Sequence, residues 1–167
     1  INISPQETAI APNLTVKENL EFIAEIYGSN KKQARQKAEN TISAFDLSEI
    51  EQTKAKILSG GWQRRLSIAM ALISEPRILF LDEPTLGLDV LARRELWNII
   101  KKLKGKVTVI LTTHYLEEAE SLSDRIGIMV KGELKAIGTV SELLKKTNTT
   151  KFEDAFIAIA ENGGMDV

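Results

Sequence analysis

Apolar residues recur at three- and four-residue steps through the first half of the chain, which is the spacing of one face of an α-helix. Thr15 and Glu18 form a capping box at the start of the first such segment, and this predicts a helix over residues 15–27. Asn30 can cap a second helix over residues 30–45, and Ser59 opens a third that extends toward residue 74. We therefore expect three helices before the first convincing strand.

After residue 76 the pattern changes to short apolar runs, which are typical of buried strands. Residues 77–81 and 107–112 are predicted as such strands, and residues 90–104 as the helix that joins them. This unit makes its two strands parallel and predicts an α/β fold with a mostly parallel sheet. Further elements are expected in this order: a helix at 116–122, a strand at 125–130, a Lys131-Gly132 turn, a hairpin arm at 134–137, a helix capped by Ser141, and a last amphipathic helix that carries Phe152, Phe156 and Ile159.

Composition narrows the class of protein without naming a partner. With 167 residues, 43% of them hydrophobic, the chain can bury the core of one domain or of two small lobes. Its 22 basic and 23 acidic residues leave a formal charge of −1, so no overall basic field attracts nucleic acid. The absence of cysteine excludes disulfides and is typical of a reducing compartment, with the cytoplasm as the default. The apolar runs are shorter than the roughly 20 residues that span a bilayer, so any membrane link is expected through a partner.

Candidate chemistry gathers where the two predicted parallel strands end. Asp82 and Glu83 follow the first strand directly, and His114 closes the second. Because parallel strands place their carboxyl ends at the same edge of a sheet, we expect these three side chains to lie close together. Two carboxylates there suit the handling of a metal ion and water. The alternatives are that one acid is a turn or cap residue and that a lone histidine has only a polar or core role.

The third predicted helix begins with an unusual sequence. Leu58, Ser59, Gly60 and Gly61 stand at its start, where backbone N–H groups are exposed and can bind an anion such as phosphate. The plainer alternative is a serine cap followed by two flexible glycines. Glycine inside a helix costs about 1 kcal/mol, so the pair suggests the close approach of a ligand.

Five short motifs together resemble the ATPase domain of ABC transporters over nearly the whole chain. They occur in the order and at the spacing of that family: Pro5-Gln6, Leu58-Ser-Gly-Gly61, Leu81-Asp-Glu-Pro84, Gly87-Leu-Asp89 and Thr113-His114. The resemblance implies part of a P-loop NTPase core of the RecA-like, ABC type, together with an α-helical subdomain. It also implies a division of the chain into a Q-loop segment (1–12), a helical subdomain that ends in the signature helix (13–75), the C-terminal part of the RecA-like core (76–138) and C-terminal helices (139–167).

The resemblance also implies a role for each residue of the predicted sheet edge. Asp82 is expected to hold a hydrated Mg²⁺, and Glu83 to polarise the water that attacks ATP. His114 is expected to contact the γ-phosphate, and Gln6 to sense the metal ion and the water. On this interpretation Glu83 and His114 are catalytic, while Asp82 and Gln6 serve the metal.

By the same resemblance, the nucleotide site is shared between two subunits. Ser59, Gly60 and Gly61 would cap the γ-phosphate of ATP held by the opposite subunit, and Asp89 would cross the interface between them. The second ATP-binding subunit can be identical or different. The helical subdomain is expected to dock against transmembrane permease subunits, which places the protein peripherally on the cytoplasmic face of the membrane, with no nucleic acid as a partner.

The family's phosphate-binding loop, G-x-x-x-x-G-K-[ST], does not occur in the sequence. Gly105-Lys106 is followed by Val107 and enters a predicted strand, so it does not replace the loop. In the family that loop precedes the glutamine, and we therefore expect a truncated or proteolysed product that neither binds ATP tightly nor hydrolyses it alone.

Details of the motifs favour a subtype. Trp62 stands where many members of the family have glutamine, while residues 59–65, 113–119 and 152–156 look most like prokaryotic exporters of the ABC-2 type. Two alternatives stay open: a soluble ABC ATPase that does not transport, and a non-catalytic regulatory or dimerisation fragment.

Overall fold

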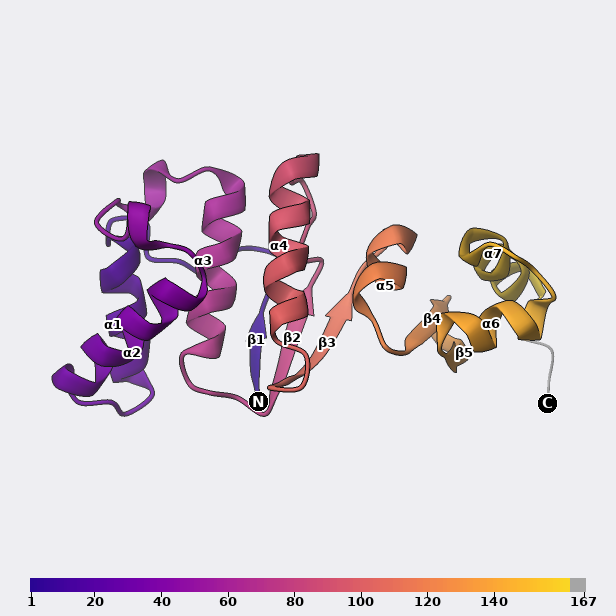
Figure 1. Cartoon of the computed structure of the whole chain (residues 1–167), viewed down its shortest axis with the longest axis horizontal. Coiled ribbons are helices and arrows are strands. Elements are labelled where there is room, and N and C mark those ends of the chain that lie inside the picture. The colour runs from indigo at the N-terminus through magenta and orange to yellow at the C-terminus, as the bar shows by residue number, and fades with distance from the viewer. Residues whose placement is uncertain (163–167) are drawn as a thin grey trace. The chain divides into compact units, whose positions relative to one another are not determined.

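The computed structural model describes residues 1–162, which belong to two compact units. The first unit spans Ile1–Thr112 and the second begins at Thr113, and each is described by itself. The elements of the first unit are β1 (Asn2–Ser4), α1 (Val16–Ile26), α2 (Lys31–Ala44), α3 (Gly60–Leu72), β2 (Ile78–Asp82), α4 (Val90–Lys102) and β3 (Thr108–Thr112), with short 3₁₀ turns at Ser48–Ile50 and Ala55–Ile57 (Figure 1). Those of the second are α5 (Leu116–Leu122), β4 (Ile126–Val130), β5 (Glu133–Gly138), α6 (Val140–Thr147) and α7 (Phe152–Asn162).

Helices α1 and α2 begin where the sequence predicts, each with a complete capping box. The Glu18 side chain accepts a hydrogen bond from the Thr15 N–H, and the Thr15 hydroxyl accepts one from the Glu18 N–H. These bonds to Thr15 hold the pKa of Glu18 below its usual range. Asn30 and Gln33 repeat the arrangement at α2. Apolar side chains at four-residue steps fix the face of α2 that is buried: Ala34, Ala38 and Ile42.

Helix α3 lies between the α1 and α2 pair and the sheet, as Figure 1 shows. All residues from Arg64 to Ala71 are buried, so the helix is enclosed on every side over these two turns. The Asn2 side-chain amide donates to the Ala71 carbonyl at 2.8 Å, and the hydroxyls of Ser4 and Ser67 lie 2.9 Å apart. Polar contacts therefore join the first strand to this helix.

The sheet of the first unit has three parallel strands in the order β1-β2-β3. Strands β2 and β3 flank α4, which confirms the predicted strand-helix-strand unit. Strand β1 was not predicted, and the expectation that three helices precede any strand is wrong. The reason is local: β1 has only three residues, and its polar side chains, Asn2 and Ser4, bond to α3 instead of completing an apolar pattern.

The expectation that β2 and β3 are buried strands is wrong for one face of the sheet. Leu79 and Leu81 are buried, but Phe80 between them is exposed, and so are its register partners Ile3 and Ile110. Ile3, Phe80 and Ile110 face one another across the three strands and are 55%, 37% and 44% exposed. Helix α3 contacts β1 and β2, while within Ile1–Thr112 the side chains of Ile3, Phe80 and Ile110 on the other face stay exposed.

The second unit contains the predicted hairpin, which is a two-stranded antiparallel sheet separate from the parallel one. Lys131 and Gly132 both have positive φ, at 50° and 82°, as the tight hairpin turn predicted for this pair requires. The predicted cap of α6 is wrong. Thr139, not Ser141, caps this helix, because Glu142 lies three residues after Thr139 and completes a capping box with it.

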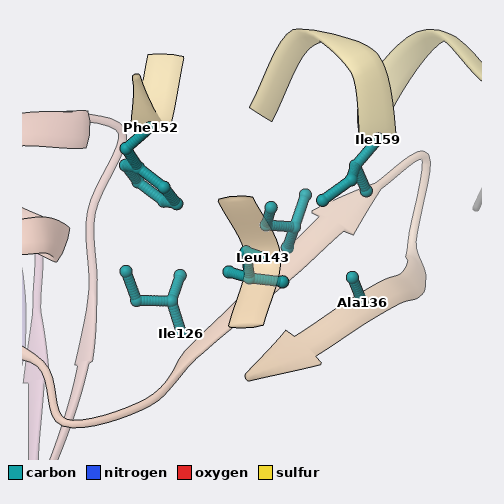
Figure 2. Close-up of a cluster of buried hydrophobic side chains, with 6 residues drawn as sticks. Ile126, Ala136, Leu143, Phe152 and Ile159 are labelled. Carbon is teal, nitrogen blue, oxygen red and sulfur yellow. The ribbon is translucent and has the colours of Figure 1, made fainter. Parts of the chain in front are cut away.

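A small apolar core holds the second unit together. Side chains from β4, β5, α6 and α7 point toward one another in Figure 2. The predicted amphipathic face of α7 is confirmed, since Phe152 and Ile159 are buried in this core and Phe156 packs against it. Within residues 1–162, every helix is too short or too polar to cross a bilayer.

Candidate functional site

The acidic pair at the end of β2 is fixed by the neighbouring strand β3. Asp82 stands in register with Thr112, and the Thr112 hydroxyl donates a hydrogen bond of 2.5 Å to Asp82 Oδ1. The Glu83 N–H is directed at Thr112 as well, 3.2 Å from both its carbonyl oxygen and its hydroxyl oxygen. Thr112 therefore sets the position of one carboxylate and of the backbone that carries the next.

Glu83 has a left-handed backbone, with φ of 44°. This conformation costs a residue other than glycine about 1–3 kcal/mol, and the surrounding structure must supply that energy. The bonds to Thr112 and the Leu86 N–H, which donates to the Glu83 carbonyl at 3.2 Å, hold this conformation in place. Strained backbone of this kind gathers at functional sites, so it favours a role for Glu83 beyond ending the strand.

A cleft of about 430 Å³ opens beside Glu83, the second acid of the pair, while Asp82 does not belong to its lining. Gln6 lines it from the segment that follows β1, and Glu83 lines it from the turn that follows β2. Gly60, at the start of α3, belongs to the same lining. Gln6 and Glu83, which follow two neighbouring parallel strands, therefore share one cleft, and the start of α3 reaches the same lining.

A buried arginine connects the walls of this cleft. Arg64 of α3 is 4% exposed, and its guanidinium donates to four backbone carbonyls in two segments. It reaches the carbonyls of Pro84 at 3.0 Å and Gln6 at 3.3 Å, and it also donates to those of Pro5 and Asp82. The Gln6 segment and the acidic turn are thus held by one side chain.

The start of α3 is exposed, as an anion site requires. Ser59 is the capping residue, but within the described chain its hydroxyl makes no hydrogen bond to the helix it precedes. A Cβ added to Gly60 would meet open space, whereas one added to Gly61 would lie 3.1 Å from the Ala92 Cβ of α4. Gly61 therefore has a packing reason to be glycine, while Gly60 has no neighbour among residues 1–162 that demands it.

Asp89 and Trp62, both from the sequence motifs, have structural partners. Asp89 caps α4, since its Oδ1 accepts hydrogen bonds from the N–H groups of Leu91 and Ala92. The Trp62 ring lies 4.2 Å from the guanidinium carbon of Arg65, a cation–π distance. Arg65 in turn donates to Glu95 of α4 at 2.6 Å. These contacts connect the start of α3 to α4.

His114 follows β3 by two residues and belongs to the second unit. Its side chain is exposed, and its ring centroid lies 4.2 Å from that of Tyr115. The meeting of His114 with Asp82 and Glu83 stays a prediction of the sequence.

The residues at the carboxyl edge fit Mg²⁺ chemistry. Among residues 1–162, no group of three or more His, Cys, Asp or Glu side chains gathers as a complete metal site. Mg²⁺ does not need one, because it keeps several waters and commonly binds one or two carboxylates together with substrate phosphates. Asp82, which Thr112 holds in place, is a suitable carboxylate.

Sequence reasoning missed two residues of this site, Arg64 and Thr112. For Thr112 the signal is its place at the end of the second parallel strand, but its pairing with Asp82 depends on the strand register. For Arg64 the sequence offers no clear signal, because it stands between Gln63 and Arg65 in a polar part of the helix. Its partners are carbonyls distant in the sequence, and no local pattern indicates them.

A three-stranded parallel sheet with acidic residues, a cleft and an exposed helix start at its edge defines an α/β domain of the nucleotide-binding class. A family model of ABC transporters matches residues 1–86, slightly more than half of the chain. The chain therefore belongs to the ABC transporter family, as an ABC nucleotide-binding domain.

Individual relatives agree with this assignment. The chain is 42% identical over 147 residues to the linearmycin resistance ATP-binding protein LnrL of Bacillus subtilis. This match covers 87% of this chain and 47% of that protein. It is 42% identical over 149 residues to ABC transporter A family member 2 of Arabidopsis thaliana and 38% identical over 146 residues to the human phospholipid-transporting ATPase ABCA3. Those matches cover 89% and 87% of this chain but only 15% and 9% of the relatives.

The fold agrees as well. A solved structure described as the ATP binding subunit of an ABC transporter matches with a TM-score of 0.78 and 25% identity, over 95% of this chain and 67% of that one. The predicted α/β fold with a P-loop NTPase type of core is thus confirmed. The chain spans less than half the length of each of the three relatives named above.

Proposed function

We propose that the chain serves in the ATP-hydrolysing motor of an ABC exporter, where hydrolysis at a dimer interface drives transport across a membrane. The observation that carries the proposal is the shared cleft of Gln6 and Glu83, fixed by Arg64 on one side and Thr112 on the other. Phosphoryl transfer depends mainly on positioning and on the neutralisation of charge at the γ-phosphate. A rigid cleft edge with carboxylates supports that chemistry.

Each residue of the edge has a role in this proposal. Asp82 would hold Mg²⁺ through its hydration shell, and the ion would neutralise charge on the phosphate oxygens. Glu83 would polarise the attacking water. The oxygen of that water would form a bond to the γ-phosphorus while the bond from the γ-phosphorus to ADP breaks. Gln6 would orient this water and report the state of the metal site. His114 would donate a hydrogen bond to the γ-phosphate.

The exposed start of α3 would act on ATP held by a second subunit. The N–H groups near Ser59, Gly60 and Gly61 would face the γ-phosphate across the interface, where the positive end of the helix favours an anion. Asp89 would lie at the same interface. Closure of the dimer would complete the site, and release after hydrolysis would separate the subunits.

Transport is supported by the names of the relatives. LnrL is described as a resistance protein and ABCA3 as phospholipid-transporting. We infer that permease subunits dock on the helical lobe, where Phe22, Ile26 and Tyr27 are exposed on α1 and at its end. The protein would then lie peripherally on the cytoplasmic face of the membrane. A formal charge of −1 gives no support to a nucleic-acid partner.

The 167 residues by themselves are proposed to bind ATP weakly and not to hydrolyse it, because no phosphate-binding loop motif occurs among them. Calorimetric titration of this chain with Mg-ATP should give no saturable heat at about micromolar affinity. Saturation in that range would contradict this part of the proposal.

The role of Glu83 tests the proposal as a whole. In an intact ATP-binding subunit, which includes a phosphate-binding loop, Glu83→Gln should lower kcat by about 100-fold or more and spare ATP binding. The ATP-bound dimer should then persist. Glu117→Gln, the same exchange at an exposed position of α5, should leave kcat unchanged. Hydrolysis at the wild-type rate in Glu83→Gln would remove Glu83 from its role.

A further inference from the structure

We propose that Arg64 is a positioning residue of the ATPase reaction, which couples the acidic turn and the Gln6 segment of one chain to the tip of α3. The inference rests on the proposed function and deepens it. Arg64 belongs to the lining of the same cleft, and the role proposed for it is the support of its walls. It acts on the backbone that carries the reacting groups, through hydrogen bonds to carbonyls on both sides of the cleft.

The chemistry of the guanidinium suits this role. It presents five N–H groups in a rigid plane and stays charged under all physiological conditions. Here Nε donates to the Pro84 carbonyl, Nη1 to those of Pro5 and Gln6, and Nη2 to that of Asp82. A lysine has one nitrogen at the end of its side chain and cannot span the same acceptors at once. The site therefore depends on the fork as well as on the charge.

Burial makes this connection stiff. Arg64 is 4% exposed, so water does not compete freely with the carbonyls for its protons. A buried cation must also keep its acceptors, because an unsatisfied charge in the interior is strongly disfavoured. A displacement of the Gln6 segment or of the acidic turn consequently acts on Arg64 and on the helix that carries it.

The position of Arg64 in α3 extends this connection to the interface. It lies four residues after Gly60, or about 6 Å along the helix axis at 1.5 Å per residue. The exposed tip of α3 therefore moves as one body with the side chain that holds the acidic turn. The site of one chain is thereby coupled to the tip that is proposed to serve the site of its partner.

The neighbouring Arg65 shows that the hydrogen bonds to the cleft walls are specific to Arg64. Its guanidinium lies against the Trp62 ring and donates to Glu95, so it joins α3 to α4. Arg65 makes no hydrogen bond in the described structure to the carbonyls that Arg64 holds. Two adjacent arginines thus perform different tasks, one toward the cleft and one toward the adjoining helix.

Steady-state kinetics of an intact ATP-binding subunit test this role. Arg64→Met removes the charge and the fork, and we expect kcat to fall by about 100-fold while the KM for ATP changes by less than about threefold, because misplaced groups cost rate more than binding. Arg64→Lys keeps the charge alone and should give an intermediate loss. Arg35→Met, the same exchange on the exposed face of α2, is the control and should leave both constants unchanged.

Amide hydrogen exchange distinguishes positioning from general support. In Arg64→Met, exchange should quicken in residues 5–8 and 82–88 together, with the core of α1 and α2 unaffected. The inference is overturned by wild-type kcat in Arg64→Met, by equal changes in kcat and KM, or by faster exchange throughout the protein. If Arg64→Met does not fold, Arg64→Lys decides by the same criteria. Failure of both variants to fold would assign Arg64 to stability and reject the proposal.

Glu83→Gln in the same assay distinguishes a failure of the proposed function from a failure of the role of Arg64. If Glu83→Gln retains wild-type turnover, the proposed function fails. If Glu83→Gln stalls hydrolysis and Arg64→Met does not alter kcat, only the role of Arg64 fails.

Discussion

The Thr112 hydroxyl donates a 2.5 Å hydrogen bond to the Asp82 carboxylate across the ends of two parallel strands. The same residue accepts the N–H of Glu83 through its carbonyl and its hydroxyl. One side chain thus orients the first acid of the pair and supports the left-handed backbone of the second. The position of the acidic pair is therefore set by β3 as much as by the strand that carries it.

Thr112→Val tests this support, because valine keeps the shape of threonine and loses its hydroxyl. We expect a loss of about 1 kcal/mol in the free energy of unfolding from the missing hydrogen bond. In an intact ATP-binding subunit kcat should fall by about tenfold, as Asp82 loses its fixed orientation. Denaturant unfolding and ATPase assays measure the two effects. Thr108→Val, an exposed position of the same strand, is the matched control and should change neither.

The two glycines at the start of α3 should respond differently to alanine. Gly60→Ala places its Cβ in open space and replaces a poor helix former, so stability should rise by about 0.5–1 kcal/mol. Gly61→Ala brings its Cβ to 3.1 Å from that of Ala92 and should gain nothing or lose about 1 kcal/mol. Denaturant unfolding of both variants provides the comparison. A larger gain for Gly61→Ala than for Gly60→Ala would contradict the packing described here.

The capping box of α6 should make the second unit sensitive to acid. The Thr139 N–H donates to the Glu142 carboxylate at 2.7 Å, and this hydrogen bond is the main reason that the pKa of Glu142 lies below its usual range. The Thr139 side chain lowers this pKa further. Because the folded pKa is the lower one, the stabilisation is present above the unfolded glutamate pKa. It is lost as the pH falls through the folded value.

Thermal unfolding as a function of pH checks this expectation. Glu142→Gln should reduce the acid-dependent loss of stability relative to the wild type. Glu161→Gln, at an exposed position of α7, should leave the pH profile unchanged. A carboxyl titration by NMR that gives Glu142 an ordinary or raised pKa would rule out the capping contribution.

Local signals in the sequence predicted most of the helices and the strand-helix-strand unit. Thr15 with Glu18 fixes a helix start within four residues, and such pairs can be recognised without knowledge of the tertiary structure. Ser141 shows the limit: two hydroxyl residues lie near the start of α6, and the sequence reasoning chose the one that does not cap it. Thr139 could have been preferred, because Glu142 stands at the capping-box distance from it.

The parts that could not be predicted depend on contacts between distant segments. Strand β1 is defined by its pairing with β2, while its polar residues bond to α3. The exposure of Phe80 depends on which sheet face α3 covers, and an apolar run alone does not indicate that choice. The contacts of Thr112 and Arg64 with the acidic turn likewise follow from register and packing. The motifs indicated which residues to consider, and tertiary contacts determined what holds them.

The central claim is that one ATP site is built from two subunits: the cleft edge with Glu83 comes from one of them, and the α3 tip with Gly60 comes from the other. Complementation in dimers of an intact ATP-binding subunit measures this directly. Gly60→Glu places a negative charge in open space at the tip, and Glu83→Gln disables the edge. Each variant alone should be nearly inactive. An equal mixture should recover about one quarter of wild-type turnover, because half of the dimers are mixed and each has one intact site of two. Turnover in the mixture no higher than the mean of the two separate variants would contradict the account.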